Sequence, residues 1–361
     1  LPWLMIRTKK TMEENVMGLQ AAVDLAVEKN QNLISAQKEL LHWHWKLCLN
    51  MRDLQRLMRP QQMKDERGNV IGTSRPVIPT KFKSTAHLPP EKYPFCLACK
   101  LATLKARPIG ASTSSKVQEK EAALTRCKVE PGDMISADQF VVKTPGRLYK
   151  GFGREAPHNC FHGGTLYTDA ASGLIRAQCQ ATLGVGETLG GKAGFEEWIW
   201  NLAGVLAKHY HSDNGIFNAE LFRKDCEEKQ QTQSFSGVGA KHQNAHAERD
   251  IQTISDWARS MMVQAAIHWP SDGADDIRLW AFAIQHAVQL YNRLPIERLG
   301  WRSPLEVFTK TKSDHRELLR AHVWGCPVFV LDPKLQDGKK LPKFNSRSRM
   351  GQFLGFSDEH S

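Results

Sequence analysis

Three strand-like segments in succession, followed by a helix, another strand and more helices, constrain the fold of this chain more than any other feature. The segments at 134–142 (MISADQFVV), 163–170 (GGTLYTDA) and 173–183 (GLIRAQCQATL) contain the β-branched and aromatic residues that favour strands. The elements predicted after them are a helix at 186–204, a strand at 204–211, and helices at 218–230, 247–267 and 275–292. This order predicts an α/β domain with a mixed sheet.

The helix at 247–267 has the clearest amphipathic pattern of the chain. Its buried side is predicted to carry Ile251, Ile254, Ala258, Met261 and Met262. The preceding segment, 234–246, has two glycines and no periodic pattern, so we expect a mobile loop there. From residue 303 the pattern turns to short elements, and strands of a small β domain are expected at 322–332 and 349–356.

Charge is unevenly distributed along the 361 residues, whose net charge is +11. Residues 1–130 contain 22 basic and 12 acidic side chains, residues 131–300 contain 16 and 19, and residues 301–361 contain 11 and 7. Basic flanks fit a polyanion and an acidic centre fits divalent cations, as in a metal-dependent enzyme that acts on nucleic acid. The alternative is that surface lysines and arginines only provide solubility.

Cysteine usage and hydropathy limit the class of protein. The eight cysteines are scattered through a large chain, which argues against a secreted disulfide framework. The chain has no apolar run long enough to span a membrane and no signal-peptide pattern, so we expect a soluble intracellular protein. The start at Leu1 and the end in GFSDEHS suggest a segment of a longer chain.

Three carboxylates lie in a strand, after a strand and at the start of a helix, which are positions from which they can converge on a two-metal phosphoryl-transfer site. Asp138 lies inside the first predicted strand, where an acid costs stability unless it is paired or bound to metal. Asp213, in HSDNG, follows the fourth strand, and Glu248 lies in the first turn of the clearest helix. Each also has an ordinary explanation. Asp138 could face solvent, Asp213 could shape the Asn-Gly turn, and Glu248 could complement the helix dipole.

Together these residues are similar to a known family. Asp138 in SADQF, HSDNG and the glutamate of KHQNAHAER resemble the Asp, Asp, Glu triad of retroviral-type integrases. Farther on, LYNRLP, SPLEVFTK, VWGCPVFVLDPK, KKLPKF and RSRMGQFLGFS resemble the integrase region of copia-type LTR retrotransposon polyproteins. The likeness runs from about Leu40 to the last residue. It implies an RNase H-like core in which Asp138, Asp213 and Glu248 bind two Mg²⁺ (or Mn²⁺) ions.

The same resemblance implies DNA contacts in the loop before the glutamate and on its helix. The residues implied by position are Lys241, Gln243, Asn244, Arg249 and Gln252. An ordinary solvated helix face is the alternative for each of them. Asp169, in YTDAASG, is the rival to Asp138 as the first carboxylate, although its context is that of a strand end.

Two further segments resemble the N-terminal His, His, Cys, Cys zinc module of the family, namely LHWHWKLCLN (41–50) and PFCLACK (94–100). Cys96 and Cys99 have the C-x2-C spacing with which one tight turn brings two thiolates to one ion. This half of the pattern is complete, and it implies that the chain binds Zn²⁺ through these two cysteines.

The helical half of the zinc pattern is not complete, because Leu49 occupies the position of the second histidine. Cys48 lies four residues after His44, which places both on the same face of a helix, and thiolate is a good zinc ligand. His42 could contribute instead, but a spacing of two residues directs it to another face. The third alternative is a broken site. The favoured ligand set is His44, Cys48, Cys96 and Cys99.

The chain is thus expected to be an integrase segment. The predicted division is 1–40 as a helical linker from upstream polyprotein, 41–107 as a helical zinc-binding-type module with a long loop, 108–130 as a linker, 131–296 as the RNase H-like catalytic core, and 300–361 as a small basic β domain. The expected reaction is two-metal strand transfer, in which the 3′-hydroxyl of element DNA attacks double-stranded target DNA. The rivals are a catalytically silent DNA-binding relic and a nuclease on the same fold.

The partners and place of action follow from the resemblance as well. Enzymes of this family work as multimers on two DNA ends, so a homo-oligomer is expected, and no membrane partner is. Action on chromosomal DNA implies the nucleus, by way of cytoplasmic virus-like particles. KKLPKF and the basic residues near it are too diffuse to define a localisation signal.

Overall fold

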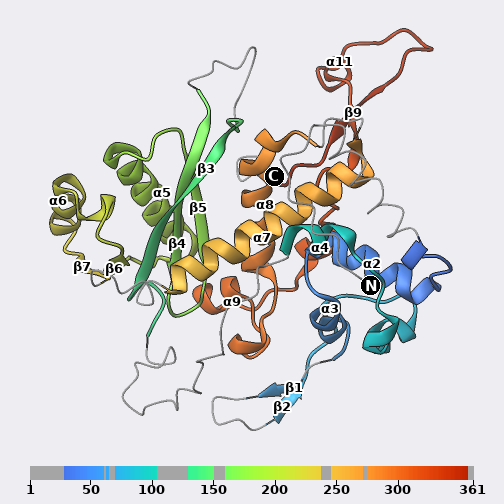
Figure 1. Ribbon diagram of the computed structural model, residues 1–361, viewed down its shortest axis with the longest axis horizontal. Helices are drawn as coiled ribbons and strands as arrows, with labels where there is room; N and C mark the ends of the chain where they lie inside the picture. Colours follow the sequence, from blue (N-terminus) through green and yellow to red (C-terminus); the bar gives the residue numbers. More distant parts are fainter. Residues whose placement is uncertain are drawn as a thin grey trace, which may run out of the picture.

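The centre of the protein, seen in a computed structural model, is a five-stranded mixed sheet (Figure 1). The structure describes residues 28–60, 62–64, 70–103, 129–149, 159–236, 245–270 and 275–356. The strands of the sheet are β3 (Ile135–Gly146), β4 (Phe161–Asp169), β5 (Ile175–Gln180), β6 (His209–Ser212) and β7 (Thr232–Phe235). Their order across the sheet is β5-β4-β3-β6-β7.

The strand directions define the topology. β3, β4 and β5 form an antiparallel meander, whereas β6 is parallel to β3 and β7 is parallel to β6. Helix α5 (Val185–Ala203) carries the chain from β5 at one edge back to the other side of β3. A parallel pairing needs such a crossover, usually a helix. This meander followed by two parallel strands is the RNase H-like arrangement that the sequence predicts.

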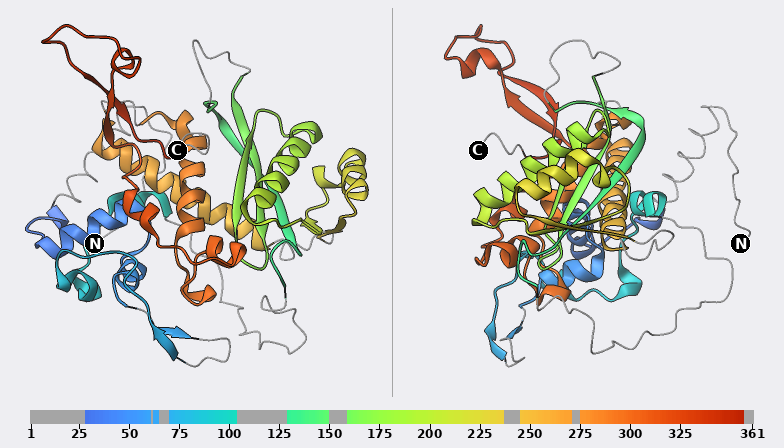
Figure 2. Two further views of the ribbon diagram at one scale, coloured as in Figure 1. Left: turned by 180° about the vertical axis from the view of Figure 1, so that it is seen from behind. Right: turned by 90° about the vertical axis from the view of Figure 1, so that its left-hand side faces the viewer.

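Helices cover both faces of the sheet (Figure 2). Alternation along β3 sends Ile135 and Ala137 to one face and Phe140 to the other. On the first face these residues pack with Phe195 of α5 and with α6, and on the second Phe140 packs with Ile254 of α7 and with α8. The bounds of these helices are α6 (Glu220–Glu228), α7 (Ala245–His268) and α8 (Trp280–Arg293). The core strand β3 is therefore buried between two helical layers.

Most elements predicted for the core are present, and the differences have local causes. The predicted strand at 204–211 begins later, at His209, because Gly204 ends α5 in the left-handed conformation (φ 64°). β7 was not predicted, and Ser234 and Phe235, expected in a loop, belong to it. Residues 237–244 of that expected loop lie outside the described residues. On α7, Ile254, Ala258 and Met261 are buried as predicted, and Ile251 and Met262 are partly buried.

A helical module formed by α2 (Ser35–Leu47), α3 (Met51–Leu57) and α4 (Leu97–Thr103) packs against α7 (Figure 1). Arg259 of α7 donates a hydrogen bond to the carbonyl of Ala102 at 2.9 Å. The predicted boundary between residues 40 and 41 falls inside α2. The helical pattern predicted at 11–40 lies outside the described residues up to residue 27. The domain limits remain predictions.

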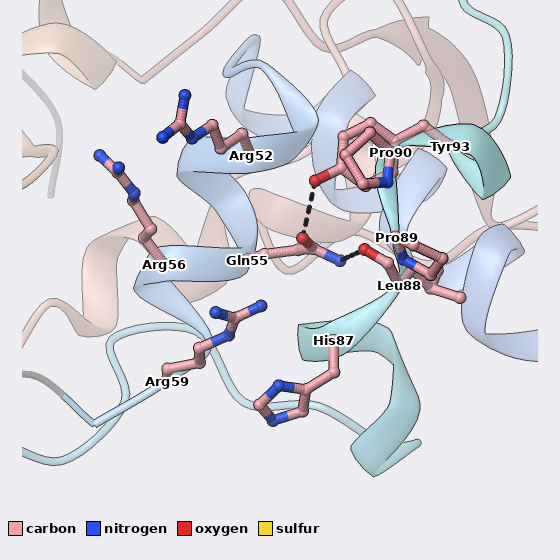
Figure 3. Close-up of a pocket in the computed structure, with 9 residues that line it drawn as sticks. All are labelled: Arg52, Gln55, Arg56, Arg59, His87, Leu88, Pro89, Pro90 and Tyr93. Carbon is pink, nitrogen blue, oxygen red and sulfur yellow. Dashed lines mark hydrogen bonds between the residues drawn. The ribbon is translucent and has the colours of Figure 1, made fainter.

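The segment between α3 and α4, predicted as a long loop, contains only short elements in its described part. They are β1 (Gln62–Lys64), β2 (Val70–Thr73) and the 3₁₀ helices η1 (Lys83–His87) and η2 (Pro90–Lys92). Buried Gln55 holds this segment on α3. Its side-chain amide donates to the carbonyls of Thr85 and Leu88, at 3.0 and 2.9 Å, and its Oε1 accepts from the Tyr93 hydroxyl at 2.8 Å (Figure 3).

Beyond α8 the chain forms short helices and one hairpin. The elements are α9 (Pro304–Thr309), α10 (Arg316–Arg320), β8 (Pro327–Leu331), α11 (Pro333–Gln336) and β9 (Ser348–Gln352). Further 3₁₀ helices are η4 (Ile216–Asn218), η7 (Ile277–Leu279) and η8 (Glu297–Leu299). Both strands predicted for the β domain are present in shorter form, as the antiparallel pair β8 and β9. Among the described residues, the structure contains no helix with the length and apolar character required to span a membrane.

Candidate catalytic and metal-binding sites

Asp138 lies on the central strand β3, on the sheet face that α7 covers. Strand alternation gives it the same side as Phe140. Its carboxylate accepts a hydrogen bond from the N–H of Gln139 at 2.8 Å. Burial, together with the negative charges of Asp213 and Glu248, raises the pKa of Asp138 to about 6, although the hydrogen bond from the Gln139 N–H acts against this rise. The three carboxylates therefore interact electrostatically.

Asp213 follows the last residue of β6, and the strand register places it beside Asp138. β3 and β6 pair in parallel with Ala137 opposite Ser212, so the next residues on the two strands are Asp138 and Asp213. Asp213 is exposed, and its Oδ1 accepts a hydrogen bond from the N–H of Gly215 at 3.3 Å. The aspartate of HSDNG thus shapes the turn and also lies beside the half-buried acid of the central strand.

Glu248 stands in the first turn of α7 and is exposed. α7 packs over β3 and β4, so its first turn brings a third carboxylate to the sheet. An acid in the first turn also complements the helix dipole, which was the ordinary explanation for this residue. Its negative charge also acts on the pKa of Asp138, so Glu248 lies near that carboxylate.

The chemistry of this donor set fits a divalent cation. Carboxylate oxygens are the ligands that Mg²⁺ and Mn²⁺ prefer, and a bound cation would relieve the repulsion that raises the pKa of Asp138. Among the described residues, a group of His, Cys, Asp or Glu ligand atoms within 4.8 Å of one another occurs at His44, Cys96 and Cys99. The ligand atoms of the three carboxylates do not all lie within 4.8 Å of one another, so a cation would have to draw them closer together.

Asp169, the rival to Asp138, has a structural role in the turn between β4 and β5. It is fully buried, and its Oδ1 accepts the N–H of Gly132 at 2.8 Å. Its Oδ2 accepts both the N–H and the hydroxyl of Ser172, at 2.8 and 2.6 Å. A carboxylate with both oxygens occupied by buried donors is a poor candidate for a metal ligand, so the structure favours Asp138.

The structure describes two of the five residues that are expected to contact DNA. Arg249 and Gln252 lie on α7 and are exposed. Gln252 is four residues after Glu248, which places it on the same side of the helix. Lys241, Gln243 and Asn244 lie outside the described residues. The structure thus places two of the five beside the carboxylates.

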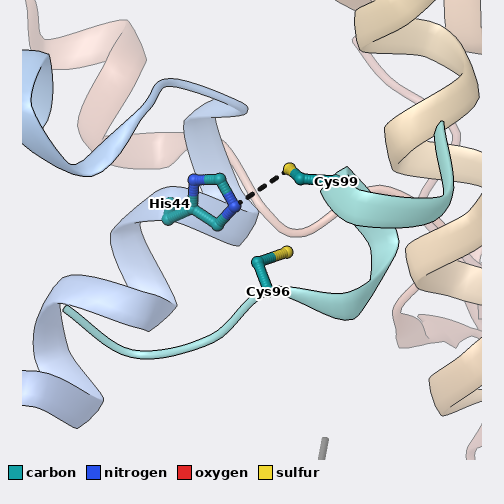
Figure 4. A group of neighbouring side chains, drawn as sticks. All are labelled: His44, Cys96 and Cys99. Carbon is teal, nitrogen blue, oxygen red and sulfur yellow. Dashed lines mark hydrogen bonds between the residues drawn. The ribbon is translucent and has the colours of Figure 1, made fainter. Parts of the chain in front are cut away.

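His44, Cys96 and Cys99 come together between α2 and α4 (Figure 4). His44 is buried, and its Nε2 lies 3.2 Å from the sulfur of Cys99. Its Nδ1 donates to the carbonyl of Leu49 at 2.5 Å, which leaves Nε2 as the atom free to bind a metal. Hydrogen bonds from Cys99 and His44 hold the pKa of the Cys96 thiol well below its ordinary value. One imidazole and two thiols within 4.8 Å of one another fit Zn²⁺.

Cys48 does not continue the face of α2, so the premise that placed it beside His44 is wrong. It is the C-cap residue of the helix, with a left-handed backbone (φ 55°). Its thiol donates toward the carbonyl of Trp257 at 3.7 Å, and burial raises its pKa to about 12. Cys48 lines the same small cavity as His44 and the other two cysteines, but its sulfur is not within 4.8 Å of all three ligand atoms. His42 is exposed on another face, as expected.

Two contributions to this cluster could not be found from sequence. One is the backbone carbonyl of Leu49, which orients His44 from the position where the family pattern has a histidine. The other is α7, whose Ser260 and Gln264 line the cavity beside the cysteines. A backbone contact and a contact between distant segments leave no pattern of residue types in the sequence.

Comparison with known proteins gives one sequence relative, and no family model matches the chain. The chain is 29% identical over 166 residues to the retrovirus-related Pol polyprotein from transposon TNT 1-94 of Nicotiana tabacum. The match covers 46% of this chain and 11% of that polyprotein, so the chain spans only about a tenth of the relative's length. The predicted resemblance to part of a retroelement polyprotein is thereby confirmed.

Solved structures of integrases are more distantly similar to this chain. The magnesium complex of the HTLV-2 integrase catalytic core domain, in its trimeric form, is 17% identical with a TM-score of 0.34, over 50% of this chain and 98% of that one. A simian T-cell lymphotropic virus intasome in complex with PP2A regulatory subunit B56 gamma is 14% identical with a TM-score of 0.37, over 62% of this chain and 68% of that one. The fold assignment rests on the strand order and not on these likenesses.

Proposed function

We propose that this chain is the integrase part of a copia-type retrotransposon polyprotein and that it joins the 3′ ends of element DNA to target DNA. The observation that supports this most is the position of Asp213 directly after β6, where the parallel register with β3 brings it next to Asp138, with Glu248 on the helix packed over the sheet. The similarity to a retrovirus-related Pol polyprotein supports the same class of enzyme.

Two Mg²⁺ or Mn²⁺ ions held by the three carboxylates would stabilise the attacking and leaving oxygens of the displaced phosphodiester. The protein's part is to hold the ligands in place. Asp138 is fixed because β3 is hydrogen-bonded on both sides, to β4 and β6. Asp213 and Glu248 are exposed, so DNA can approach the carboxylates from their side. Such a site works by positioning and charge stabilisation.

The proposal also includes the DNA contacts, the oligomeric state and the place of action. Arg249 and Gln252 lie near Glu248 on the exposed face of α7 and would contact the DNA end. Lys241, Gln243 and Asn244 precede that helix in the sequence and are proposed to contribute as well. The integrase core structures that the chain resembles are described as trimeric and dimeric, and we propose a homo-oligomer on two DNA ends. Joining to chromosomal DNA would take place in the nucleus.

The Asp213→Asn variant tests the catalytic proposal. Asparagine keeps an oxygen to accept the Gly215 N–H, so the turn should survive, but it removes a charged metal ligand. A labelled blunt duplex is incubated with plasmid DNA and Mg²⁺ or Mn²⁺, and joined products are counted. We expect joining by the unaltered chain and none by the variant. Asp314→Asn is the matched control, because Asp314 is an exposed aspartate that pairs with Arg316.

Other outcomes of this experiment assign the rival functions. Cleavage of DNA without joining, lost in Asp213→Asn, would identify a nuclease on the same fold. Salt-dependent DNA binding without any metal-dependent product in either protein would identify a catalytically silent relic. Equal joining by both proteins would remove Asp213 from the site.

We also propose that the helical module binds one Zn²⁺ through His44, Cys96 and Cys99. Metal content of the purified full chain is expected to fall from about one zinc per chain to none in Cys96→Ser, since two thiolates and one imidazole form the site. Cys48→Leu is expected to keep its zinc, because the Cys48 thiol is directed to the Trp257 carbonyl. Loss of zinc in Cys48→Leu would instead restore Cys48 as the fourth ligand.

A further inference from the structure

A basic cavity lies on the helical module, apart from both metal-binding clusters. It has a volume of about 420 Å³ and is open to solvent between α3 and the segment that holds η1 and η2 (Figure 3). Arg52, Arg56 and Arg59 line one side, and Pro89, Pro90 and Tyr93 line the other. Its volume is within the range of small-molecule sites, which is roughly 300–1,000 Å³.

Arg52 and Arg56 lie on one face of α3, because residues four apart face the same side of a helix. Arg59 comes two residues after the end of α3, and its side chain lines the same wall. The opposite face of α3 carries Leu54 and Leu57, which are fully buried in the hydrophobic cluster shared with α7. The arginine face must therefore point away from the core, and three guanidinium groups line one wall.

The arginines differ in how firmly they are held. Arg56 forms an ion pair with Glu297 at 2.5 Å, which fixes this wall to the segment after α8. Arg59 donates from Nε to the carbonyl of Ala86 at 2.6 Å. Arg52 is exposed and has no carboxylate partner among the described residues. None of the described residues that line the cavity is acidic, and His87 adds an imidazole to the three guanidinium groups.

The opposite wall is fixed before any ligand arrives. Buried Gln55 binds the carbonyls of Thr85 and Leu88 and the hydroxyl of Tyr93, so the wall cannot move independently of α3. Two successive prolines restrict the backbone there. A preformed cavity loses little conformational freedom on binding, which favours affinity.

We propose that this cavity binds one nucleotide unit of a nucleic-acid strand. Its phosphate would lie against Arg52 and Arg59, since arginine is suited to phosphate recognition, and its base or sugar would lie against Pro89, Pro90 and Tyr93. The cavity is larger than a bare phosphate requires, and its second wall is apolar and aromatic, as in sites that stack unpaired bases. The identification of the anion as nucleic acid rests on the proposed function. The presence of the basic cavity is independent of that function.

The test is the binding of a labelled single-stranded DNA oligonucleotide to the full chain without added divalent metal, over a range of salt concentrations. Arg52→Ala and Arg59→Ala are each expected to weaken binding several-fold and to reduce the slope of log affinity against log salt by roughly 0.7, the effect of one lost phosphate contact. Arg59→Lys keeps the charge and should keep the slope. Arg223→Ala, an exposed arginine on α6, is the matched control.

A nucleoside monophosphate is added as competitor in a second arm. Displacement of the strand by the monophosphate, but not by the nucleoside, would support recognition of the phosphate. Unchanged affinity and slope in Arg52→Ala would overturn the proposal, and so would equal losses in Arg52→Ala and Arg223→Ala, which would show only a general effect of charge. Binding of the monophosphate without any binding of the strand would overturn the assignment to nucleic acid. Since no joining is measured, a failure of the proposed catalysis leaves these results unaffected.

Discussion

Asp138→Asn is expected to abolish strand joining and, at the same time, to stabilise the metal-free protein above pH 6. The loss of joining follows from the removal of a carboxylate ligand, whose contribution of several kcal/mol corresponds to a rate loss of roughly 10³-fold. The gain in stability follows from the pKa of Asp138, which burial raises to about 6. A carboxyl group with a raised pKa stabilises the folded state fully only below its unfolded pKa, and this contribution is lost as pH rises through about 6.

The measurement is thermal unfolding of both proteins at pH 5 and pH 8, with and without Mg²⁺. At pH 8 without metal, replacing the charged carboxylate by a neutral amide should stabilise the fold by about 1 kcal/mol, since the side chain is partly open to solvent. At pH 5 the difference in stability should be smaller, and the two proteins should unfold together only below the unfolded pKa of the carboxyl group, which is about 4. Added Mg²⁺ should stabilise the unaltered chain more than the variant. A variant that is less stable at pH 8 would show that Asp138 is a structural residue with a satisfied charge.

Lys192→Ala is expected to cause the largest loss of stability, roughly 3 to 5 kcal/mol, because it removes the buried cation of an ion-pair network and leaves two half-buried carboxylates paired only with the more exposed Lys229. Lys192 is fully buried on α5. Its ammonium lies 2.7 Å from Glu196 and 2.5 Å from Asp225, and it donates to Gln231 at 2.6 Å. It also lies over the ring of Tyr210, 5.0 Å from the centroid. This network joins α5 to α6, to β6 and to Gln231, the residue before β7.

Urea unfolding at several pH values measures the loss of stability in Lys192→Ala and shows its origin. Hydrogen bonds from Lys192, Lys229 and Gln231 outweigh the effect of burial and lower the pKa of Glu196 to about 2. A depressed pKa means that the stabilisation is present above the unfolded pKa and is lost as pH falls toward 2. The difference between the two proteins should therefore narrow between pH 5 and pH 2. Lys208→Ala, which removes an exposed pair with Asp133, should cost less than about 1 kcal/mol.

The core was predictable from sequence where its signals are local. Strand residues between glycines predicted β3, β4 and β5, and helical periodicity predicted α5 and α7, since these patterns depend only on neighbouring residues. β7 escaped prediction because TQSF is short and polar. Pairing with β6 makes it a strand, and that contact joins residues far apart in the chain. The neighbouring positions of Asp138 and Asp213 likewise depend on strand register, which composition does not reveal.

The zinc-type cluster was likewise predictable from sequence only where its signals are local. The C-x2-C spacing of Cys96 and Cys99 is a local signal, and the structure places these cysteines beside His44. The prediction that Cys48 shares a helical face with His44 is wrong by a single residue of helix length, because α2 ends at Leu47 and Cys48 has a left-handed backbone. Zinc binding by Cys48 stays a prediction, since Cys48 lines the same cavity as the other three residues. No glycine marks this helix end, so the usual sequence signal for a C-cap was missing.

Because α4 packs along α7, we expect the helical module and the sheet domain to unfold as a single cooperative unit. Leu40 and Leu54 of the module and Met261 of α7 belong to one hydrophobic cluster. A fragment beginning at residue 131 would uncover the apolar side of α7, at a cost of about 25 cal/mol for each Å² exposed. A substitution that destabilises the helical module would therefore also destabilise the sheet domain.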